Sequence, residues 1–188
     1  MTTKSAPKDK VFRTAAQLFY RHGYRAIGVD TLAAKAGIGK MTLYRHYPSK
    51  DDLITAYLKD SDEMFWEAFE KVTQKSAAPR GKLLAFFEAL QEYVGTPASH
   101  GCPFLNVAAE YPEADHAGHQ VALQHKQSVR ARFRELAGAA GAKKPDVLAD
   151  QLVLLMDGAY MASRVFGPQS PASHLAAAAR TLIDAALE

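Results

Sequence analysis

Cysteine is nearly absent from this sequence, since Cys102 is the single one among 188 residues. One cysteine excludes an internal disulfide framework, which suits a reducing compartment. Long apolar runs are also missing. Even the longest strictly aliphatic runs are short, such as that at residues 152–156, whereas a bilayer-spanning helix needs roughly 20 apolar residues. The polar N-terminus lacks the apolar segment of a signal peptide. We therefore predict a cytoplasmic protein with no membrane partner.

Catalytic signatures are lacking as well. The sequence contains no GxSxG, P-loop, GxGxxG or paired-carboxylate motif. His116 and His119 have the helical spacing that a shared metal needs, but His125 extends this pair poorly and Cys102 is distant in sequence. Cys102 is near His100 and could be a reactive thiol, but a small buried residue is the better interpretation. We expect no enzyme activity, no cofactor and no metal site.

Acidic residues are scarce in the N-terminal quarter of the chain. Residues 1–50 contain ten Lys and Arg against two Asp and Glu, whereas residues 51–188 contain thirteen against eighteen. Residues 31–49 contain no acidic residue at all. A basic segment joined to an acidic remainder indicates that one end of the protein binds a polyanion.

The acid-free segment has the pattern of two short helices joined by a tight turn. Apolar residues recur at spacings of three and four over residues 29–36, which predicts an amphipathic helix. Gly37 is suited to end this helix, and Gly39 to precede the next one, at residues 40–46. This order of elements predicts a helix-turn-helix.

The second of these helices divides into a core face and an outward face. Leu43 and Tyr47 are four residues apart and form a stripe that can face the core. The remaining positions form the outward columns Lys40/Tyr44, Met41/Arg45 and Thr42/His46. A helix face that only meets water would more often carry Glu and Lys, so this face favours binding to phosphates.

The rest of the chain also has a helical period, so the predicted fold class is all-α. A polar tail is expected at residues 1–9, with lysines such as Lys4 that could touch DNA. Helices are expected at residues 10–22, 29–36, 40–46, 50–75, 83–94, 103–111, 114–140, 145–166 and 171–187, about nine in all. In the first of them Phe12, Leu18 and Phe19 are expected to face the core.

Two stretches together resemble a known family. The segment GIGKMTLYRHYPSKDDL at residues 37–53 resembles the recognition-helix signature of the TetR family of bacterial transcriptional regulators. FRTAAQLFYRHGYRAIGVDTLAAKAG, at residues 12–37, resembles the two helices before it. The resemblance covers roughly residues 10–55. It implies a DNA-binding domain at residues 1–48 and an effector-binding and dimerisation domain at residues 49–188.

The resemblance also implies which residues meet DNA. The positions that correspond to DNA contacts of the family are Gly28, Asp30, Thr31, Lys40, Met41, Thr42, Tyr44, Arg45, His46 and Lys50. Lys40, Tyr44, His46 and Lys50 suit phosphates, whereas Arg45 suits a guanine edge and Met41 a thymine methyl group. Two residues depart from the pattern: Gly28 stands where the family usually has Ser or Thr, and Met41 where Gly is common.

Family resemblance further implies a homodimer that binds a palindromic operator, usually as a repressor, and responds to a small-molecule effector. The broadly apolar, Ala-rich final helix needs a cover, so we expect dimerisation through the last two helices. Candidate effector-binding residues are Trp66, Phe69, Phe86, Phe104, Asn106, Tyr111, His125, Tyr160 and Arg164. Aromatic residues at helical spacing are also typical of an ordinary core, so this assignment is the less specific one.

Two other functions stay open on the sequence alone. The chain could be a helical small-molecule-binding protein or enzyme with an incidental basic end. It could also be a nucleoid protein that binds DNA without sequence preference. The acid-free segment argues against the first of these, because it would then have no purpose.

Overall fold

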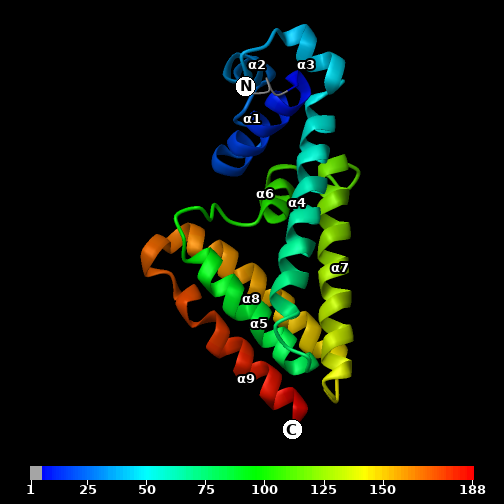
Figure 1. The fold of residues 1–188 in the computed structure, drawn as a ribbon, viewed down its shortest axis with the longest axis vertical. Coiled ribbons are helices and arrows are strands. Elements are labelled where there is room, and N and C mark those ends of the chain that lie inside the picture. The colour runs from blue at the N-terminus through cyan, green and yellow to red at the C-terminus, as the bar shows by residue number, and fades with distance from the viewer. Residues whose placement is uncertain (1–5) are drawn as a thin grey trace. The chain divides into compact units, whose positions relative to one another are not determined.

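The computed structural model describes residues 6–188, and these form nine α-helices and two short 3-10 helices with no strand (Figure 1). The helices are α1 (Pro7–His22), α2 (Val29–Ala36), α3 (Lys40–His46), α4 (Lys50–Thr73), α5 (Pro79–Val94), α6 (Pro103–Glu110), α7 (Ala117–Ala139), α8 (Pro145–Phe166), η1 (Gly167–Gln169), η2 (Pro171–His174) and α9 (Leu175–Leu187). The prediction of an all-α fold with about nine helices is confirmed.

Prolines account for two of the differences in helix boundaries. α1 begins at Pro7 and α5 at Pro79, each some residues before the predicted start, because proline fits the first turn of a helix. The predicted tail therefore ends before Pro7, and Lys4 lies outside the described residues. The predicted helix at residues 171–187 is divided, since the Ser170 hydroxyl accepts a hydrogen bond from the Ala172 N–H and starts η2 ahead of α9.

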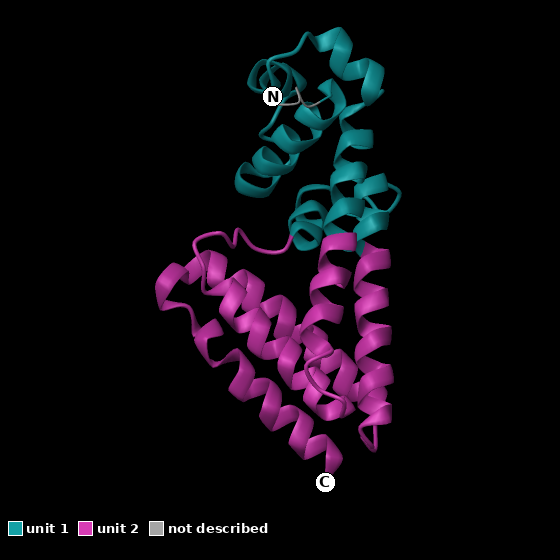
Figure 2. Ribbon diagram, in the orientation of Figure 1, with its two compact units in different colours: residues 1–62, 103–122 teal, residues 63–102, 123–188 magenta. Residues whose placement is uncertain are grey.

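The chain forms two compact units (Figure 2). Unit 1 contains the described residues up to 62 together with residues 103–122, and unit 2 contains residues 63–102 and 123–188. α4 and α7 each contribute residues to both units. The division into functional domains at residue 48 stays a prediction.

The core of unit 1 is built on α1. Val11, Ala15 and Phe19 follow one another at intervals of four and are fully buried. Phe12 and Leu18, which were predicted to face this core, are only half-buried, so that prediction was one residue out of register at Phe12. α1 packs against α2 and α3, and we call these three helices the head.

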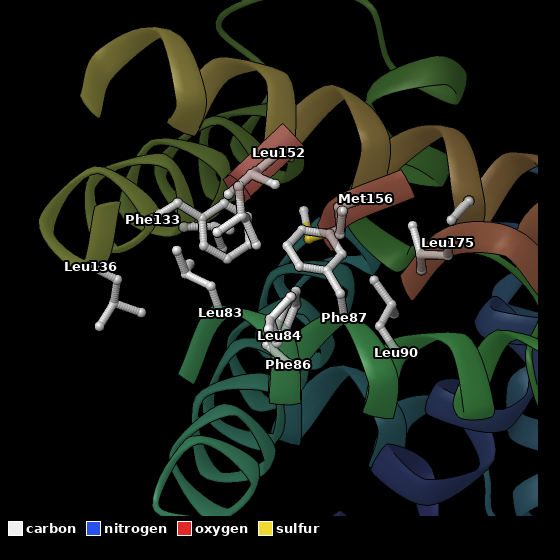
Figure 3. Packing of buried hydrophobic residues seen from close by; sticks show 14 of the residues in the cluster. Leu83, Leu84, Phe86, Phe87, Leu90, Phe133, Leu136, Leu152, Met156 and Leu175 are labelled. Carbon is white, nitrogen blue, oxygen red and sulfur yellow. The ribbon is translucent and has the colours of Figure 1, made fainter. Parts of the chain in front are cut away.

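The core of unit 2 is a cluster of phenylalanine, leucine and alanine side chains. Phe69, Phe86, Phe87 and Phe133 pack ring against ring, with centroid separations from 5.1 to 6.5 Å. Leucines of α5, α8 and α9 lie around Phe86, Phe87 and Phe133, as Figure 3 shows. The helices α5, α8 and α9 pack against one another around this cluster.

None of the helices formed by residues 6–188 is both long and apolar enough to cross a membrane.

Candidate nucleic-acid interface

The turn between α2 and α3 fixes the position of α3. Gly37 adopts φ 63° and ψ 39°, a left-handed conformation that favours glycine. The Gly37 N–H donates to the Ala34 carbonyl and the Ile38 N–H to the Ala33 carbonyl, both at 3.1 Å. This pair of bonds is a Schellman motif, which satisfies the last carbonyls of α2. The predicted helix end at Gly37 is confirmed, and the turn has a defined geometry.

α3 is anchored by one side and exposed on the other. Leu43 is fully buried and Tyr47, just after the helix, is buried as well, as predicted from their spacing. Lys40, Tyr44 and Arg45 are exposed. The outward face of α3 is therefore free to contact another molecule while the inward face holds the helix in the head.

Met41 is the most unusual residue of this face, because 81% of its surface is exposed. An apolar side chain in water gains nothing from hydration, and burial of a methionine side chain gives about 1.5–3 kcal/mol. Met41 lies one turn from Arg45 on the same column of the helix. An apolar contact and a guanidinium side by side are the groups that read a thymine methyl group and a guanine edge.

Asp30 and Lys40 connect the first turns of α2 and α3. The Lys40 ammonium lies 2.9 Å from the Asp30 carboxylate, and both side chains are largely exposed. The hydrogen bond from Lys40 to Asp30, together with the attraction between their charges, raises the pKa of Lys40 above its usual value. Lys40 is therefore fully protonated at neutral pH, as a phosphate ligand must be.

The start of α4 is a capping box. The Ser49 hydroxyl accepts from the Asp52 N–H at 3.0 Å, and Asp52 in turn accepts from the Ser49 N–H at 3.0 Å and from the Ser49 hydroxyl at 2.7 Å. This cap fixes the first turn of α4, where Lys50 is the first helical residue.

Lys50 is half-buried at this helix start. Burial lowers the pKa of Lys50 below its usual value, although the nearby negative charges of Asp51 and Glu110 partly offset this effect. A cation at a helix N-terminus is also opposed by the helix dipole. The charge of Lys50 therefore costs stability.

Replacing Lys50 with methionine is accordingly expected to raise the thermal midpoint of the head at pH 7. The folded-state pKa of Lys50 lies below the unfolded value, so protonation favours the unfolded chain, and the gain should shrink as the pH rises toward about 10.4. The effect is measured by heating the wild type and Lys50→Met at pH 7 and at pH 10, with amide exchange in the head as the signal of unfolding. A midpoint that falls at both pH values would show that Lys50 stabilises the head.

The remaining predicted DNA contacts differ in accessibility. Gly28 and Thr31 are exposed, and a Cβ atom at Gly28 would meet no atom within 4 Å. Thr42 and His46 are half-buried. The Nε2 atom of His46 is buried without a hydrogen-bond partner, so in this conformation it is not offered to a ligand. The DNA contacts of all these residues stay predictions.

Sequence reasoning missed the residue that supports the head from outside, Glu110 at the end of α6. Its carboxylate accepts two bonds from the Tyr24 N–H at 2.9 Å and one from the Arg25 N–H at 2.6 Å, in the loop between α1 and α2. The Tyr24 hydroxyl donates to the Pro103 carbonyl, at 2.9 Å, at the other end of α6. α6 therefore holds the loop that leads into the helix-turn-helix.

A stack of three side chains continues this support. The Arg25 guanidinium lies 4.9 Å from the centre of the Tyr111 ring, and the His116 imidazole stacks on Tyr111 at 4.1 Å. His116 Nδ1 accepts from the Gly118 N–H at 3.1 Å, while Nε2 lies 3.7 Å from the Asp51 carboxylate.

Over residues 6–188 no three His, Cys, Asp or Glu side chains lie close enough together to hold a metal ion.

Comparison with known proteins identifies the family. Residues 11–57 match the sequence model of bacterial regulatory proteins of the tetR family, and residues 79–179 match that of the tetracyclin repressor-like C-terminal domain. The chain belongs to the TetR family. The helix-turn-helix built by α2 and α3 is therefore that of a TetR-family regulator.

Solved TetR-family structures resemble the whole chain. A TetR-family transcriptional regulator from Streptomyces coelicolor is 30% identical with a TM-score of 0.92, over 97% of this chain and 96% of that one. A putative TetR-type regulator from Streptomyces avermitilis is 34% identical with a TM-score of 0.87, over 97% and 98% of the two chains. The HTH-type transcriptional repressor KstR2 of Mycolicibacterium smegmatis is 24% identical over 170 residues, which are 88% of this chain and 82% of the repressor. The protein is a ligand-responsive, DNA-binding transcriptional regulator.

In this TetR-family chain the predicted effector residues fall into both units. Phe104, Asn106 and Tyr111 lie in unit 1, and the other six lie in unit 2. Phe69 and Phe86 are buried within the aromatic core, and His125 is buried with its ring 4.8 Å from that of Phe65. Trp66 and Tyr160 are half-buried, and Arg164 is exposed and donates to the His100 carbonyl at 3.2 Å. The structure does not gather all nine residues in one unit, and their effector contacts stay predictions.

Proposed function

We propose that this TetR-family regulator is a homodimeric repressor that binds a palindromic operator through α3 and leaves it when a small molecule binds. The observation that carries the proposal is the outward face of α3, where exposed Lys40, Met41, Tyr44 and Arg45 lie on a helix anchored by Leu43. Such a helix fits the major groove of duplex DNA.

The proposed roles follow from the chemistry of each side chain. Lys40, Tyr44 and Lys50 bind phosphates and fix the register of the protein on the duplex. Arg45 donates two hydrogen bonds to a guanine edge, and Met41 contacts a thymine methyl group. Thr31, Thr42 and His46 contribute at the edges of this surface, as does the backbone at Gly28.

Repression rests on analogy with the repressor KstR2, to which most of the chain is similar. A regulator of this kind acts on the chromosome, so we keep the cytoplasm as its expected location. An effector that binds one conformer of the protein better than the other shifts the equilibrium away from the DNA-binding one. For the effector we propose an apolar or aromatic small molecule, because the candidate residues of unit 2 include two half-buried aromatic side chains, Trp66 and Tyr160.

The proposed dimer uses α8 and α9. Leu154, Met161 and Val165 of α8 are exposed at spacings of seven and four, so they form one outward stripe opposite the buried face of that helix. α9 presents the exposed small residues Ala177 and Ala185. Two copies that pack these faces against each other bury an apolar surface that water would otherwise cover.

Two variants distinguish base recognition from phosphate binding: Arg45→Ala removes the proposed base contact, and Lys50→Met removes the proposed phosphate contact. Arg45→Ala is expected to relax the preference at one base position per half-site and to cost about 1–3 kcal/mol on the preferred sequence. Lys50→Met is expected to weaken binding to every sequence. It should also reduce the slope of log binding constant against log salt concentration by about one unit. Titration of both variants against a set of operators with single base changes measures this. Equal effects of both variants on every duplex would refute the division of roles.

A further inference from the structure

Asp30 is an exception on the proposed DNA-binding surface. It is the single acidic residue between positions 28 and 50 of the chain, and its side chain is 80% exposed. An exposed carboxylate repels the phosphates that the surrounding residues are suited to bind. Asp30 therefore needs a different explanation from the basic and polar residues around it.

The partner of Asp30 is a proposed phosphate ligand, Lys40. Its ammonium is 2.9 Å from the Asp30 carboxylate, and its side chain is 49% exposed. Both side chains are accessible, so the bond between them can open without unfolding any element. A phosphate oxygen offers the Lys40 ammonium the same charge and the same hydrogen-bond geometry as the Asp30 carboxylate does.

We propose that Asp30 competes with DNA phosphate for the Lys40 ammonium, and so lowers the affinity of the regulator for every duplex. The inference rests on the proposed function, since it needs Lys40 to contact DNA. Ion pairing with Asp30 reduces the number of phosphates that the protein neutralises, and with it the number of counterions released. Asp30 thus keeps the affinity for duplex DNA low enough for the protein to dissociate from it.

A structural role for Asp30 is the alternative, because an acidic residue in the first turn of a helix stabilises that helix. Asp9 provides the matched control. It is exposed, it lies in the first turn of α1, and its change to asparagine alters the net charge by the same amount. A general charge effect, or an effect of the helix dipole, would be similar in Asp9→Asn and Asp30→Asn.

The test is a salt titration of binding to a random-sequence duplex by the wild type, Asp30→Asn, Asp9→Asn, Lys40→Met and the double variant Asp30→Asn/Lys40→Met. Asp30→Asn is expected to bind more tightly at low salt and to steepen the salt dependence by about 0.9 unit per phosphate gained. From about 50 to about 200 mM salt, its affinity should fall about 3.5-fold more than that of the wild type. Asp9→Asn should follow the wild type.

The double variant shows whether Asp30 acts through Lys40. With Lys40 replaced, Asp30→Asn should no longer steepen the salt dependence, because no cation is released. Equal steepening in Asp9→Asn, or steepening that persists without Lys40, would overturn the inference. If the wild type binds duplex and Lys40→Met weakens it while Asp30→Asn has no effect, the inference alone fails. If the wild type binds no duplex even at low salt, the proposed function fails with it.

Discussion

A protein that carries Leu154→Glu together with Val165→Glu is expected to be monomeric and to bind a palindromic operator about 100-fold more weakly. Leu154 and Val165 are 72% and 71% exposed on the outward stripe of α8. In the proposed dimer they are buried, and unpaired carboxylates are costly in an apolar interface. The loss of affinity follows because a monomer binds only one half-site at a time. Light scattering and operator titration measure the two effects.

Met64→Glu together with Leu123→Glu is the matched control for the dimer prediction. Met64 of α4 and Leu123 of α7 are exposed apolar residues of unit 2 that lie outside the proposed interface. This variant has the same change in charge and should remain dimeric with full operator affinity. A dimer that survives the two changes on α8 would contradict the proposed interface.

Gly23→Ala is expected to destabilise the head by about 3 kcal/mol. Gly23 adopts φ 84° and ψ 174°, a region occupied almost only by glycine. A Cβ atom at this position would also lie 2.5 Å from Glu110 Oε1, so the carboxylate would have to shift, which weakens its bonds to the Tyr24 and Arg25 N–H groups. Amide exchange of α1–α3 measures the effect, since the only tryptophan, Trp66, lies in unit 2.

Two comparison variants identify the cause of this destabilisation. Gly28→Ala is the control, because Gly28 has φ −82° and open space around it, so the change should cost less than about 1 kcal/mol. Adding Glu110→Ala to Gly23→Ala removes the close approach but leaves the backbone strain. The two changes together should therefore cost less than the sum of their separate effects. Exchange rates in Gly23→Ala that match those in Gly28→Ala would show that the loop tolerates a side chain.

The helix-turn-helix was predictable from the sequence because its boundaries are local. Gly37 marks the end of one short helix and Gly39 the start of the next, and the bounds of α2 and α3 agree with that prediction. Leu43 and Tyr47 are buried because the helical period sets which side faces the core. In α1 the same reasoning failed by one residue, because Val11 and Phe12 are both apolar and only packing decides between them.

The support of the head by α6 was not predictable, because Glu110 and the residues that it holds are 85 and 86 positions apart. No periodicity connects a glutamate at the end of one helix with backbone N–H groups in a distant loop. The pairing of Asp30 with Lys40 was missed for a similar reason, since it depends on the turn that brings α2 and α3 together. Contacts of this kind follow from the folded chain and not from the local pattern.

Effector binding is the part of the account that the sequence defines least. Phe69 and Phe86 have the spacing and chemistry of pocket residues, yet aromatic rings surround them as in an ordinary core. Trp66 contacts Phe65 and Phe69 with its ring edge-on, at 5.3 and 5.5 Å, and keeps part of its surface exposed. Hydrophobic patterning alone does not distinguish a side chain that lines a ligand site from one that fills a core.

Selection of bound sequences from a random duplex library tests whether this protein is a dimer that reads a palindromic operator. The wild type should enrich a palindrome whose half-sites are about one helical turn or a multiple of it apart, and Lys40→Ala/Tyr44→Ala should enrich none. The enriched palindrome would also be the operator for the experiments above. Uniform binding of unrelated duplexes by the wild type, with no enriched sequence, would refute the proposed operator recognition and indicate a protein that binds DNA without sequence preference.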